Sequence, residues 1–449
     1  MKTALVLFNR DLRVRDNPAL FAAARADRVV PLFVFDERLL GSRFAAPNRV
    51  AFMREALADL DAALKRVGGR LFLRRGNAVD EAIAVARQCG AAELHVSADW
   101  SSYARRREAR LAAACEEEGV DFVAHPGATI VAPGAVTPTG GDHFKVFTPY
   151  HRAWSEAPLR QVHGAPRKLA VPSKLRSPRL PALAQLTDGD PSPDRARGGE
   201  SEGRKLMRAF LRDGLAEYEA RHDDLPGDAT SRLSPHLRFG CLSPLELMLA
   251  ARERRGGAAF VRQLCWRDFH HQVLAATPSL PWRDYRPRGD RWSRSKRALA
   301  AWREGRTGYP LVDAGMRQLA AEGFVHNRAR MTVASFLVKD LYVDWREGAW
   351  HFWDLLSDGE IANNAGNWQW VAGTGNDTRP NRVLNPVRQA ERFDPEGAYV
   401  RRYVPELATV RGRDVFRPWL MEGFDRLGYP TPIVDHDEAV AEFRARREA

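Results

Sequence analysis

Five short apolar runs recur through the first 130 residues, and segments with a helical pattern separate them. The runs read ALVLF, VVPLFVF, RLFLRR, AELHVS and VDFVAH. Between the second and third runs, apolar residues from Val50 to Leu64 recur three or four positions apart, as on one face of a helix. Alternating strands and helices are typical of a parallel sheet that helices cover on both faces. We therefore expect residues 1–130 to form an α/β domain with a doubly wound parallel sheet.

The loops that usually bind nucleotide phosphates in such a sheet are absent from the sequence. No G-x-G-x-x-G follows the first run, and no G-x-x-x-x-G-K-[ST] occurs anywhere. A dinucleotide or triphosphate bound in these loops is therefore not expected.

The pattern changes after this domain. Residues 164–200 contain six prolines and no sustained periodicity, which is typical of a segment that crosses a surface between domains. Later segments such as LVDAGMRQLAAEGF and HNRARMTVASFLVKDLYVDW show helical stripes and almost no strand-like alternation. We expect residues 131–200 to be a long connector and residues 201–449 to be a large all-α domain.

The charge of the chain favours a polyanionic partner. The 69 Lys and Arg exceed the 57 Asp and Glu, which gives a formal net charge of +12. An arginine- and alanine-rich composition from a GC-rich genome would produce the same excess without any nucleic-acid partner. The four cysteines are widely spaced, so neither disulfides nor a metal site is expected. The sequence has no signal-peptide pattern and no apolar run of membrane length, which favours the cytoplasm.

One predicted helix carries an unusual polar face. In FVRQLCWRDFHHQV, the side chains of Gln263, Trp266, Arg267 and His270 are spaced to share one side of the helix. We expect this face to be exposed, because a core would not accept its mixture of amide, indole and cationic groups. A polar group beside an aromatic plate suits a pocket for an extruded base. The alternative is that tryptophans here simply fill the core of a helical domain.

A second candidate site is the turn in GDATSRLSPHLRFG. Thr230, Ser231 and Ser234 lie just before a predicted helix, where hydroxyls and free backbone N–H groups can hold phosphate. A plain helix N-cap is the alternative.

Eight motifs, in order and over nearly the whole chain, resemble the photolyase/cryptochrome family. They are FNRDLRVRDNPAL, KVFTPY, TSRLSPHLRFG, WRDFHHQV, GYPLVDAGMRQL, HNRARMTVASFLVKDLYVDWREG, NNAGNWQWVAGTG and RVLNP. The resemblance implies an α/β domain that can hold an antenna chromophore and a helical domain that binds FAD in a U shape. It also implies light-driven repair of UV-damaged DNA by a monomeric protein.

The resemblance implies a set of FAD-binding residues. Arg330 and Asp358 would pair beside the isoalloxazine ring, Asn364 would face flavin N5, and Asn363 would be structural. The expected FAD contacts are Tyr218, Thr230, Ser231, Arg232, Leu233, Ser234, Arg267, Arg330, Asp358, Glu360 and Asn364.

The tryptophans divide into two implied roles. Trp292, Trp345 and Trp368 match the family's electron-transfer chain, with Trp368 nearest the flavin. Trp266 and Trp370 match opposite walls of the substrate pocket, and the basic segment 286–297 is expected to border the DNA-binding face. The expected substrate contacts are Trp266, Asn327, Arg328, Met331, Trp370, Arg382 and Gln389.

The pocket residues favour one lesion. Family members that repair (6-4) photoproducts need a histidine pair where this chain has Asn327 and Met331, the residues of enzymes that split cyclobutane pyrimidine dimers. Gln263, an expected catalytic residue, argues against this assignment, because cyclobutane-dimer enzymes commonly carry glutamate at its position. We expect cleavage of cyclobutane dimers by electron transfer to a flipped-out lesion, with a (6-4) photolyase or a cryptochrome photoreceptor as the alternative.

The antenna chromophore is a separate question. Arg49, Asp99 and Arg238 resemble the contacts of members that bind a deazaflavin, whereas the acidic residue expected near Ala104 for a folate is missing. A deazaflavin is therefore favoured over methenyltetrahydrofolate, and a domain without a second chromophore is the alternative.

Overall fold

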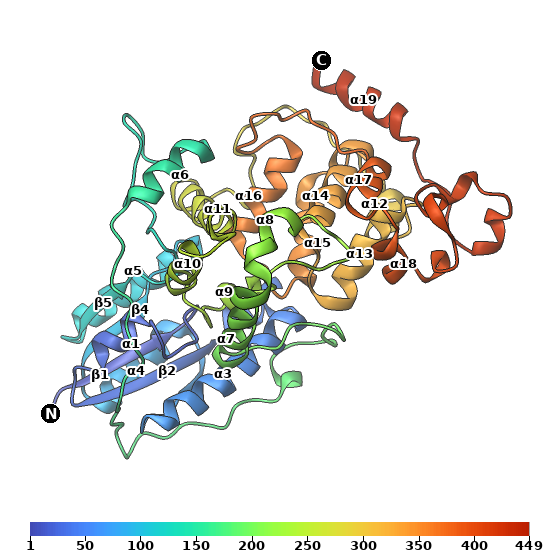
Figure 1. The fold of residues 1–449 in the computed structure, drawn as a ribbon. Coiled ribbons are helices and arrows are strands. Elements are labelled where there is room, and N and C mark those ends of the chain that lie inside the picture. Colours follow the sequence, from blue (N-terminus) through green and yellow to red (C-terminus); the bar gives the residue numbers. More distant parts are fainter. Residues whose placement is uncertain (449) are drawn as a thin grey trace.

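A computed structural model describes residues 1–448 of the chain (Figure 1). The first domain contains a five-stranded, all-parallel sheet with the strand order β3-β2-β1-β4-β5. The expected doubly wound sheet is confirmed, and each of the five apolar runs forms a strand. The strands are β1 (Thr3–Phe8), β2 (Arg28–Asp36), β3 (Phe72–Gly76), β4 (Ala91–Ser97) and β5 (Asp121–His125).

Helices cover both faces of this sheet because successive strand residues point to opposite sides. In β1, Ala4, Val6 and Phe8 pack on one side, and Leu5 and Leu7 pack on the other. The first side is covered by α1 (Pro18–Ala23) and α3 (Pro47–Arg66), and the second by α4 (Ala78–Cys89) and α5 (Ser102–Glu117). The strand order reverses between β1 and β4, so a crevice forms beyond their carboxyl ends, where ligands of such sheets usually bind.

The connector packs on both domains. Its helix α6 (Phe147–Glu156) buries Phe147, Tyr150 and Trp154 in the same core as the helical domain. The later part runs back along the α/β domain, where the Leu169 N–H donates to the Val67 carbonyl at 2.7 Å. By its packing, α6 therefore belongs with the helical domain.

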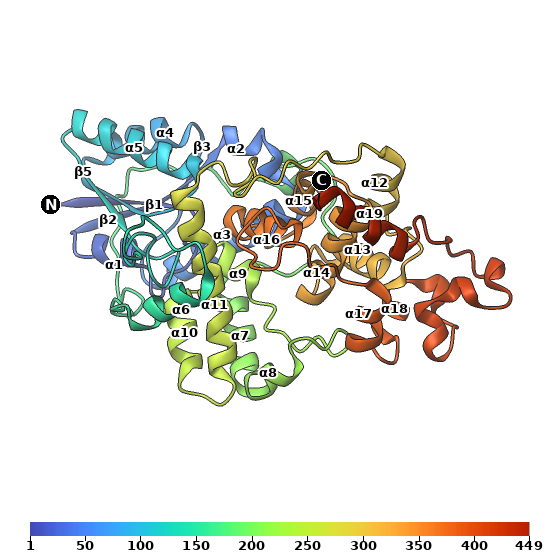
Figure 2. The same ribbon diagram turned by 90° about the horizontal axis from the view of Figure 1, so that it is seen from above.

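Residues 200–448 are largely helical, as expected, and one isolated β-bridge joins Ser293 to Val343. The helices α11 and α16 lie side by side at the centre of this domain (Figures 1 and 2). Within residues 1–448, no helix is long and apolar enough to cross a membrane. The helices are α7 (Glu200–Ala209), α8 (Tyr218–Arg221), α9 (Ser234–Arg238), α10 (Pro244–Arg252), α11 (Gly257–Ala276), α12 (Lys296–Arg303), α13 (Pro310–Glu322), α14 (Asn327–Ser335), α15 (Trp345–Leu355), α16 (Ile361–Ala372), α17 (Pro386–Phe393), α18 (Ala398–Tyr403) and α19 (His436–Glu448).

One buried carboxylate attaches the connector to α11. The side chain of Asp268 is fully buried and accepts hydrogen bonds from the N–H groups of Ile130 at 2.8 Å and Val131 at 3.0 Å. The indole N–H of Trp154 on α6 donates to the same carboxylate at 3.0 Å. Burial raises the pKa of Asp268 to about 6.

We expect the stabilising contribution of Asp268 to decrease as pH rises. An acid whose pKa is raised on folding binds its proton more tightly in the folded state, so stability is lost as pH rises through the window from its ordinary value near 3.8 to about 6. The loss is up to about 3 kcal/mol. Asp268→Asn has no such titration.

Denaturant unfolding of wild type and Asp268→Asn at pH 4 and pH 7 measures this effect. The free energy of unfolding of wild type, relative to the variant, should be lower at pH 7 than at pH 4. A difference that does not change with pH would contradict a raised pKa for this carboxyl.

Candidate functional site

A buried group of charges lies where the two domains meet. Arg10 follows β1 at the crevice of the sheet, and its Nη1 lies 3.1 Å from Asp99 Oδ2 beyond β4. The same Nη1 lies 3.2 Å from Glu360 Oε1 at the start of α16. Arg10 Nε also donates to the carbonyl of Arg238, at 3.2 Å. Burial alone would raise the pKa of Asp99, but Arg10, the Ser101 N–H and the neighbouring His271 together outweigh it and lower that pKa to about 2.

Glu360 also sets the beginning of α16. Its carboxylate caps the helix by accepting from the Asn363 backbone N–H at 3.0 Å and from the Asn363 amide at 2.7 Å. Burial opposes ionisation of Glu360, but the neighbouring basic side chains, His271 first and then the arginines Arg10, Arg267 and Arg238, together lower its pKa well below the ordinary value. Asn363 therefore contacts the helix cap, in keeping with a structural role.

Several buried polar atoms around this group have no hydrogen-bond partner within residues 1–448. They include Arg10 Nη2, Arg238 Nη1 and both ring nitrogens of His271, whose pKa burial lowers to about 3. Thr230 Oγ1 and Asp358 Oδ1 are also buried and have no hydrogen-bond partner among these residues. Because buried polar groups in proteins nearly always have partners, this set of donors and acceptors fits a polar ligand.

The turn before α9 is shaped by its own side chains. Arg232 has a positive φ of 52° and pairs with Asp228, with Nε and Oδ1 2.8 Å apart. Ser234 Oγ donates to Asp358 Oδ2 at 2.6 Å. Leu233, the N-cap residue, is buried and has no side-chain cap. The turn is therefore not a plain side-chain N-cap, and it leaves the Thr230 hydroxyl for another partner.

The structure also brings together the residues expected around the ring of a flavin. Arg330 Nη2 donates to Asp358 Oδ2 at 2.8 Å, as the expected pair requires. The side-chain amide of Asn364 donates to the carbonyl of Ala349 at 2.9 Å, which fixes its orientation. Tyr218 is buried on α8, and burial raises its pKa to about 12. Arg267 Nη1 donates to the carbonyl of Ala128 at 2.7 Å, so this side chain reaches towards the connector.

The three tryptophans of the expected chain pack in one core. Trp345 is fully buried, and its indole N–H donates to Asp284 at 2.8 Å. Trp368 is buried against Phe352, with ring centroids 5.1 Å apart. A Cβ at Gly348 would lie 2.2 Å from the Trp368 ring, so this glycine allows α15 and α16 to approach closely. Trp292 is partly buried at the edge of the same core.

The expected substrate residues lie on several elements. Trp266 is half-buried, and its ring stacks on Phe147 with centroids 3.7 Å apart. Arg382 lies over the ring of Trp370 at 4.9 Å. The other four lie on α14 and α17. On α14, Asn327 and Met331 are side by side, with Nδ2 and Sδ 3.9 Å apart, and Arg328 pairs with Asp223. Gln389 lies on α17, and its Oε1 is buried.

The expectation of one exposed face on α11 is partly wrong. Gln263 is exposed and Trp266 and Arg267 are half-buried, but His270 is only 2% exposed. A Cβ at Gly366 of α16 would lie 2.2 Å from His270 Nδ1, so the glycine makes room for this ring between the two helices. The sequence pattern alone could not reveal a partner glycine almost a hundred residues away.

The expected antenna residues lie close to the same charged group. Phe44 has the guanidinium of Arg238 at 5.4 Å and that of Arg49 at 5.8 Å from its ring centre. Arg49 donates to the backbone carbonyls of Arg43 at 2.6 Å, Phe44 at 3.2 Å and Leu356 at 3.2 Å, so its guanidinium ties α3 to the helical domain. Sequence reasoning missed Phe44 and Glu108, whose carboxylate accepts from the Asp99 N–H and whose pKa burial raises to about 7.

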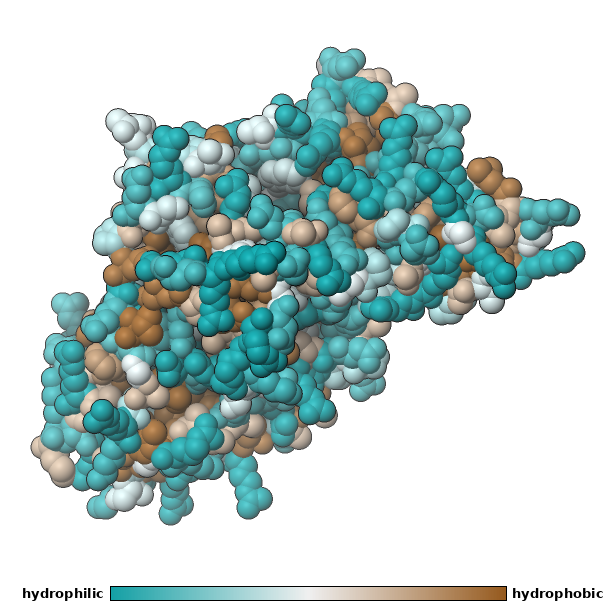
Figure 3. Space-filling model, viewed as in Figure 1, coloured by the Kyte–Doolittle hydropathy of each residue, from teal (hydrophilic) through white to brown (hydrophobic). Residues whose placement is uncertain are grey.

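The basic segment 286–297 borders the end of α16. The Arg286 N–H donates to the Thr374 carbonyl at 2.7 Å, and Arg288 Nε donates to the Gly373 carbonyl at 3.2 Å. Exposed cations in this segment therefore lie close to the helix that carries Trp370. Hydrophilic residues also cover most of the face shown in Figure 3.

Comparisons with known proteins agree with this geometry. The family model described as DNA photolyase matches residues 4–171, and that described as the FAD binding domain of DNA photolyase matches residues 260–449. The deoxyribodipyrimidine photo-lyase of Streptomyces griseus is 56% identical over 454 aligned positions, covering 100% of this chain and 99% of that protein.

Two solved structures have the same fold over nearly their whole length. The class III photolyase from Agrobacterium tumefaciens has a TM-score of 0.93 at 31% identity, covering 100% of this chain and 97% of that one. An archaeal photolyase from Sulfolobus tokodaii, solved with two FAD molecules, has a TM-score of 0.87 at 33% identity and covers 99% of both chains. This chain belongs to the photolyase/cryptochrome family.

Proposed function

We propose that the protein is a deoxyribodipyrimidine photo-lyase that splits cyclobutane pyrimidine dimers in UV-damaged DNA under blue light. The observation that carries this proposal is the set of unpartnered buried polar atoms around Arg10, Thr230, Arg238, His271 and Asp358, which lies beside a core rich in tryptophan. The full-length similarity to a photo-lyase supports the same reaction.

These residues fit FAD by their chemistry. The Thr230 hydroxyl and the backbone of the turn up to Ser234 would hold the phosphates. Reduced FAD, when bound, supplies an electron after absorbing light. The Asn364 amide can hydrogen-bond a reduced, anionic ring without adding a second negative charge, whereas a carboxylate would oppose that anion.

The pocket walls suit a flipped pyrimidine dimer. The rings of Trp266 and Trp370 provide planar stacking surfaces, and Arg382 over Trp370 adds a positive charge for the DNA backbone. Gln263, exposed on α11, can hydrogen-bond the carbonyl groups of the lesion. Neither Asn327 nor Met331 can donate a proton with a suitable pKa, which favours a cyclobutane dimer over a (6-4) photoproduct.

A second chromophore would bind close to Phe44, Asp99 and Arg238. The unpartnered guanidinium nitrogen of Arg238 beside Phe44 suits a flat, acidic molecule, and the acidic residue expected near Ala104 for a folate is missing, so a deazaflavin is favoured over a folate. The two FAD molecules of the Sulfolobus relative, described as implying a novel light-harvesting cofactor, support a second site of this kind. We further propose that the protein acts as a monomer in the cytoplasm.

Trp368→Phe should nearly abolish photoreduction of the bound flavin by an external thiol. Phenylalanine fills most of the same space, but it is far harder to oxidise than indole, so the chain through Trp345 and Trp292 would be interrupted. Flavin absorbance under blue light follows the reaction. Trp419→Phe, in the same domain but outside the chain, is the matched control, and photoreduction of Trp368→Phe at the wild-type rate would show a different electron route.

Trp266→Ala should weaken binding of a dimer-containing duplex by about 1–3 kcal/mol through lost stacking. The dependence of binding on salt should change little, because the phosphate contacts of the basic segment remain. Trp266→Phe keeps a ring on Phe147 and should lose less affinity. Equal binding of damaged and undamaged duplex by wild type would contradict the assignment of this pocket.

Gln263→Glu should leave repair of the cyclobutane dimer intact or increase it, because the side chain only hydrogen-bonds the lesion. Wild type should leave (6-4) photoproducts unrepaired. Chromatography of one oligonucleotide of each lesion after blue-light exposure of the photoreduced protein measures both. Repair of the (6-4) lesion alone would make the protein a (6-4) photolyase, and repair of neither, with flavin bound and reducible, would place it among the photoreceptors.

A further inference from the structure

A buried lysine contacts the backbone of the loop that carries Arg382. Lys339 is 2% exposed, and its Nζ donates to the carbonyl of Pro380 at 3.1 Å and to the carbonyl of Arg382. We propose that Lys339 is a positioning residue for DNA binding, which holds the loop 373–385 so that the Arg382 guanidinium stays over the ring of Trp370. This inference rests on the proposed binding of a pyrimidine dimer against that ring.

A π-helical turn presents the lysine to the loop. The helix α14 continues directly into this turn, Phe336–Asp340. Such turns are rare in proteins and occur frequently at functional sites. One turn earlier, Ser335 Oγ accepts a hydrogen bond from the Leu384 N–H at 3.1 Å. Two side chains of one helical segment, Ser335 and Lys339, therefore hold the last part of the loop.

A lysine at this position is unfavourable for stability alone. Its neighbours Leu337 and Val338 are fully buried, and burial, followed by the positive charge of Arg447, lowers the pKa of Lys339 to about 7. Burying an amine costs free energy unless the amine is hydrogen-bonded, whereas a methionine would fill similar space without this cost. Within residues 1–448, both hydrogen bonds of the Lys339 amine go to the loop. The amine therefore contributes by what it holds.

The loop folds back on the end of α16. Gly373, which ends this helix, has a φ of 77°, and a Cβ there would lie 2.5 Å from the carbonyl oxygen of Pro380. The chain therefore returns to the helix end after only seven residues. Lys339 donates to the same carbonyl of Pro380 from the interior of the domain. The lysine thus fixes the point at which the returning chain meets α16.

A loop fixed in this way prepares Arg382 for DNA. Arg382 is exposed, and its guanidinium carbon lies 4.9 Å from the centre of the Trp370 ring. Association costs free energy when loops and long side chains become ordered only on binding. Because Lys339 holds the backbone of residues 380–382 in the free protein, much of this ordering precedes the encounter with DNA. Without the amine, we expect the guanidinium to leave the indole face for part of the time.

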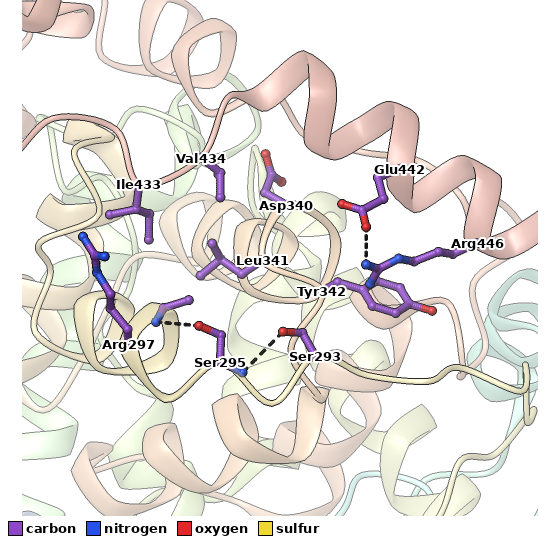
Figure 4. A pocket seen from close by; sticks show the side chains of 11 residues that line it. Ser293, Ser295, Arg297, Asp340, Leu341, Tyr342, Ile433, Val434, Glu442 and Arg446 are labelled. Atoms are coloured by element: carbon purple, nitrogen blue, oxygen red, sulfur yellow. Dashed lines mark hydrogen bonds and ion pairs between the residues drawn. The ribbon is translucent and has the colours of Figure 1, made fainter.

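The helix α19 covers the lysine on the side away from the loop. It packs on the π-helical turn, and the ring centre of its Phe443 lies 5.4 Å from Lys339 Nζ. The residues that follow the lysine, from Asp340 to Tyr342, line a cavity of about 350 Å³ under α19 (Figure 4). Lys339 is not among the residues that line this cavity. Its amine therefore acts on the loop and not on a molecule bound in the cavity.

A double-mutant cycle on DNA affinity tests the positioning role. Lys339→Met and Arg382→Ala should each raise the Kd of the flavin-loaded protein for a dimer-containing duplex several-fold. The double variant should bind no more weakly than Arg382→Ala, because Lys339 then has no guanidinium left to position. Lys339→Met should keep the wild-type flavin absorption and the wild-type repair rate at saturating DNA. Tyr429→Phe removes a buried hydroxyl that donates to Asp313, and as the control it should bind like wild type.

Hydrogen exchange separates a released loop from a general loss of structure. The amides of residues 373–385 should exchange several-fold faster in Lys339→Met, while those of α14 and α16 keep their wild-type rates. Ser335→Ala removes the second contact with the loop and should show the same pattern, also if Lys339→Met does not fold. Wild-type affinity in these variants, or losses that simply add in the cycle, would overturn the positioning role and leave lesion binding in place. Equal affinity of wild type for damaged and undamaged duplex would overturn the proposed function and this inference together.

Discussion

One buried guanidinium connects the two domains at the point where the site begins. Arg10 contacts Asp99 at the end of a strand of the sheet and Glu360 at the cap of α16. Buried ion pairs often add little net stability, because desolvation offsets their attraction, but removing one partner leaves an uncompensated charge. Their main effect here is geometric, since they fix the start of α16 against the sheet.

The position of α16 then determines the rest of the site. This helix carries Asn364, Trp368 and Trp370, so one rigid element would place the proposed flavin amide, the proposed inner electron donor and a proposed wall of the substrate pocket. Gly366 and Gly348 let α11 and α15 approach it closely. On the proposed function, these amide and indole groups are close together in the sequence because they serve different parts of one site along a single helix.

The sequence predicted the local elements well and the long-range contacts poorly. The five strands could be predicted as short apolar runs, and the helix over Pro47–Arg66 could be predicted from the regular spacing of its apolar residues, because one face of that helix is buried. The burial of His270 could not, because it depends on a glycine of another helix. The FNRDLRVRDNPAL motif contained Arg10, but its charged partners lie about 90 and 350 residues further on. The packing of α6 on α11 likewise depends on Asp268, which no local pattern marks as a partner.

The central claim is that the unpartnered buried atoms of this site are the binding groups for FAD. The most direct measurement is the flavin content of the purified protein, read from its visible absorption and from the chromophore released on denaturation. The account predicts one FAD per chain, and a lower unfolding temperature once the flavin is removed. Protein that purifies without flavin, and whose unfolding temperature does not change when FAD is added, would contradict it.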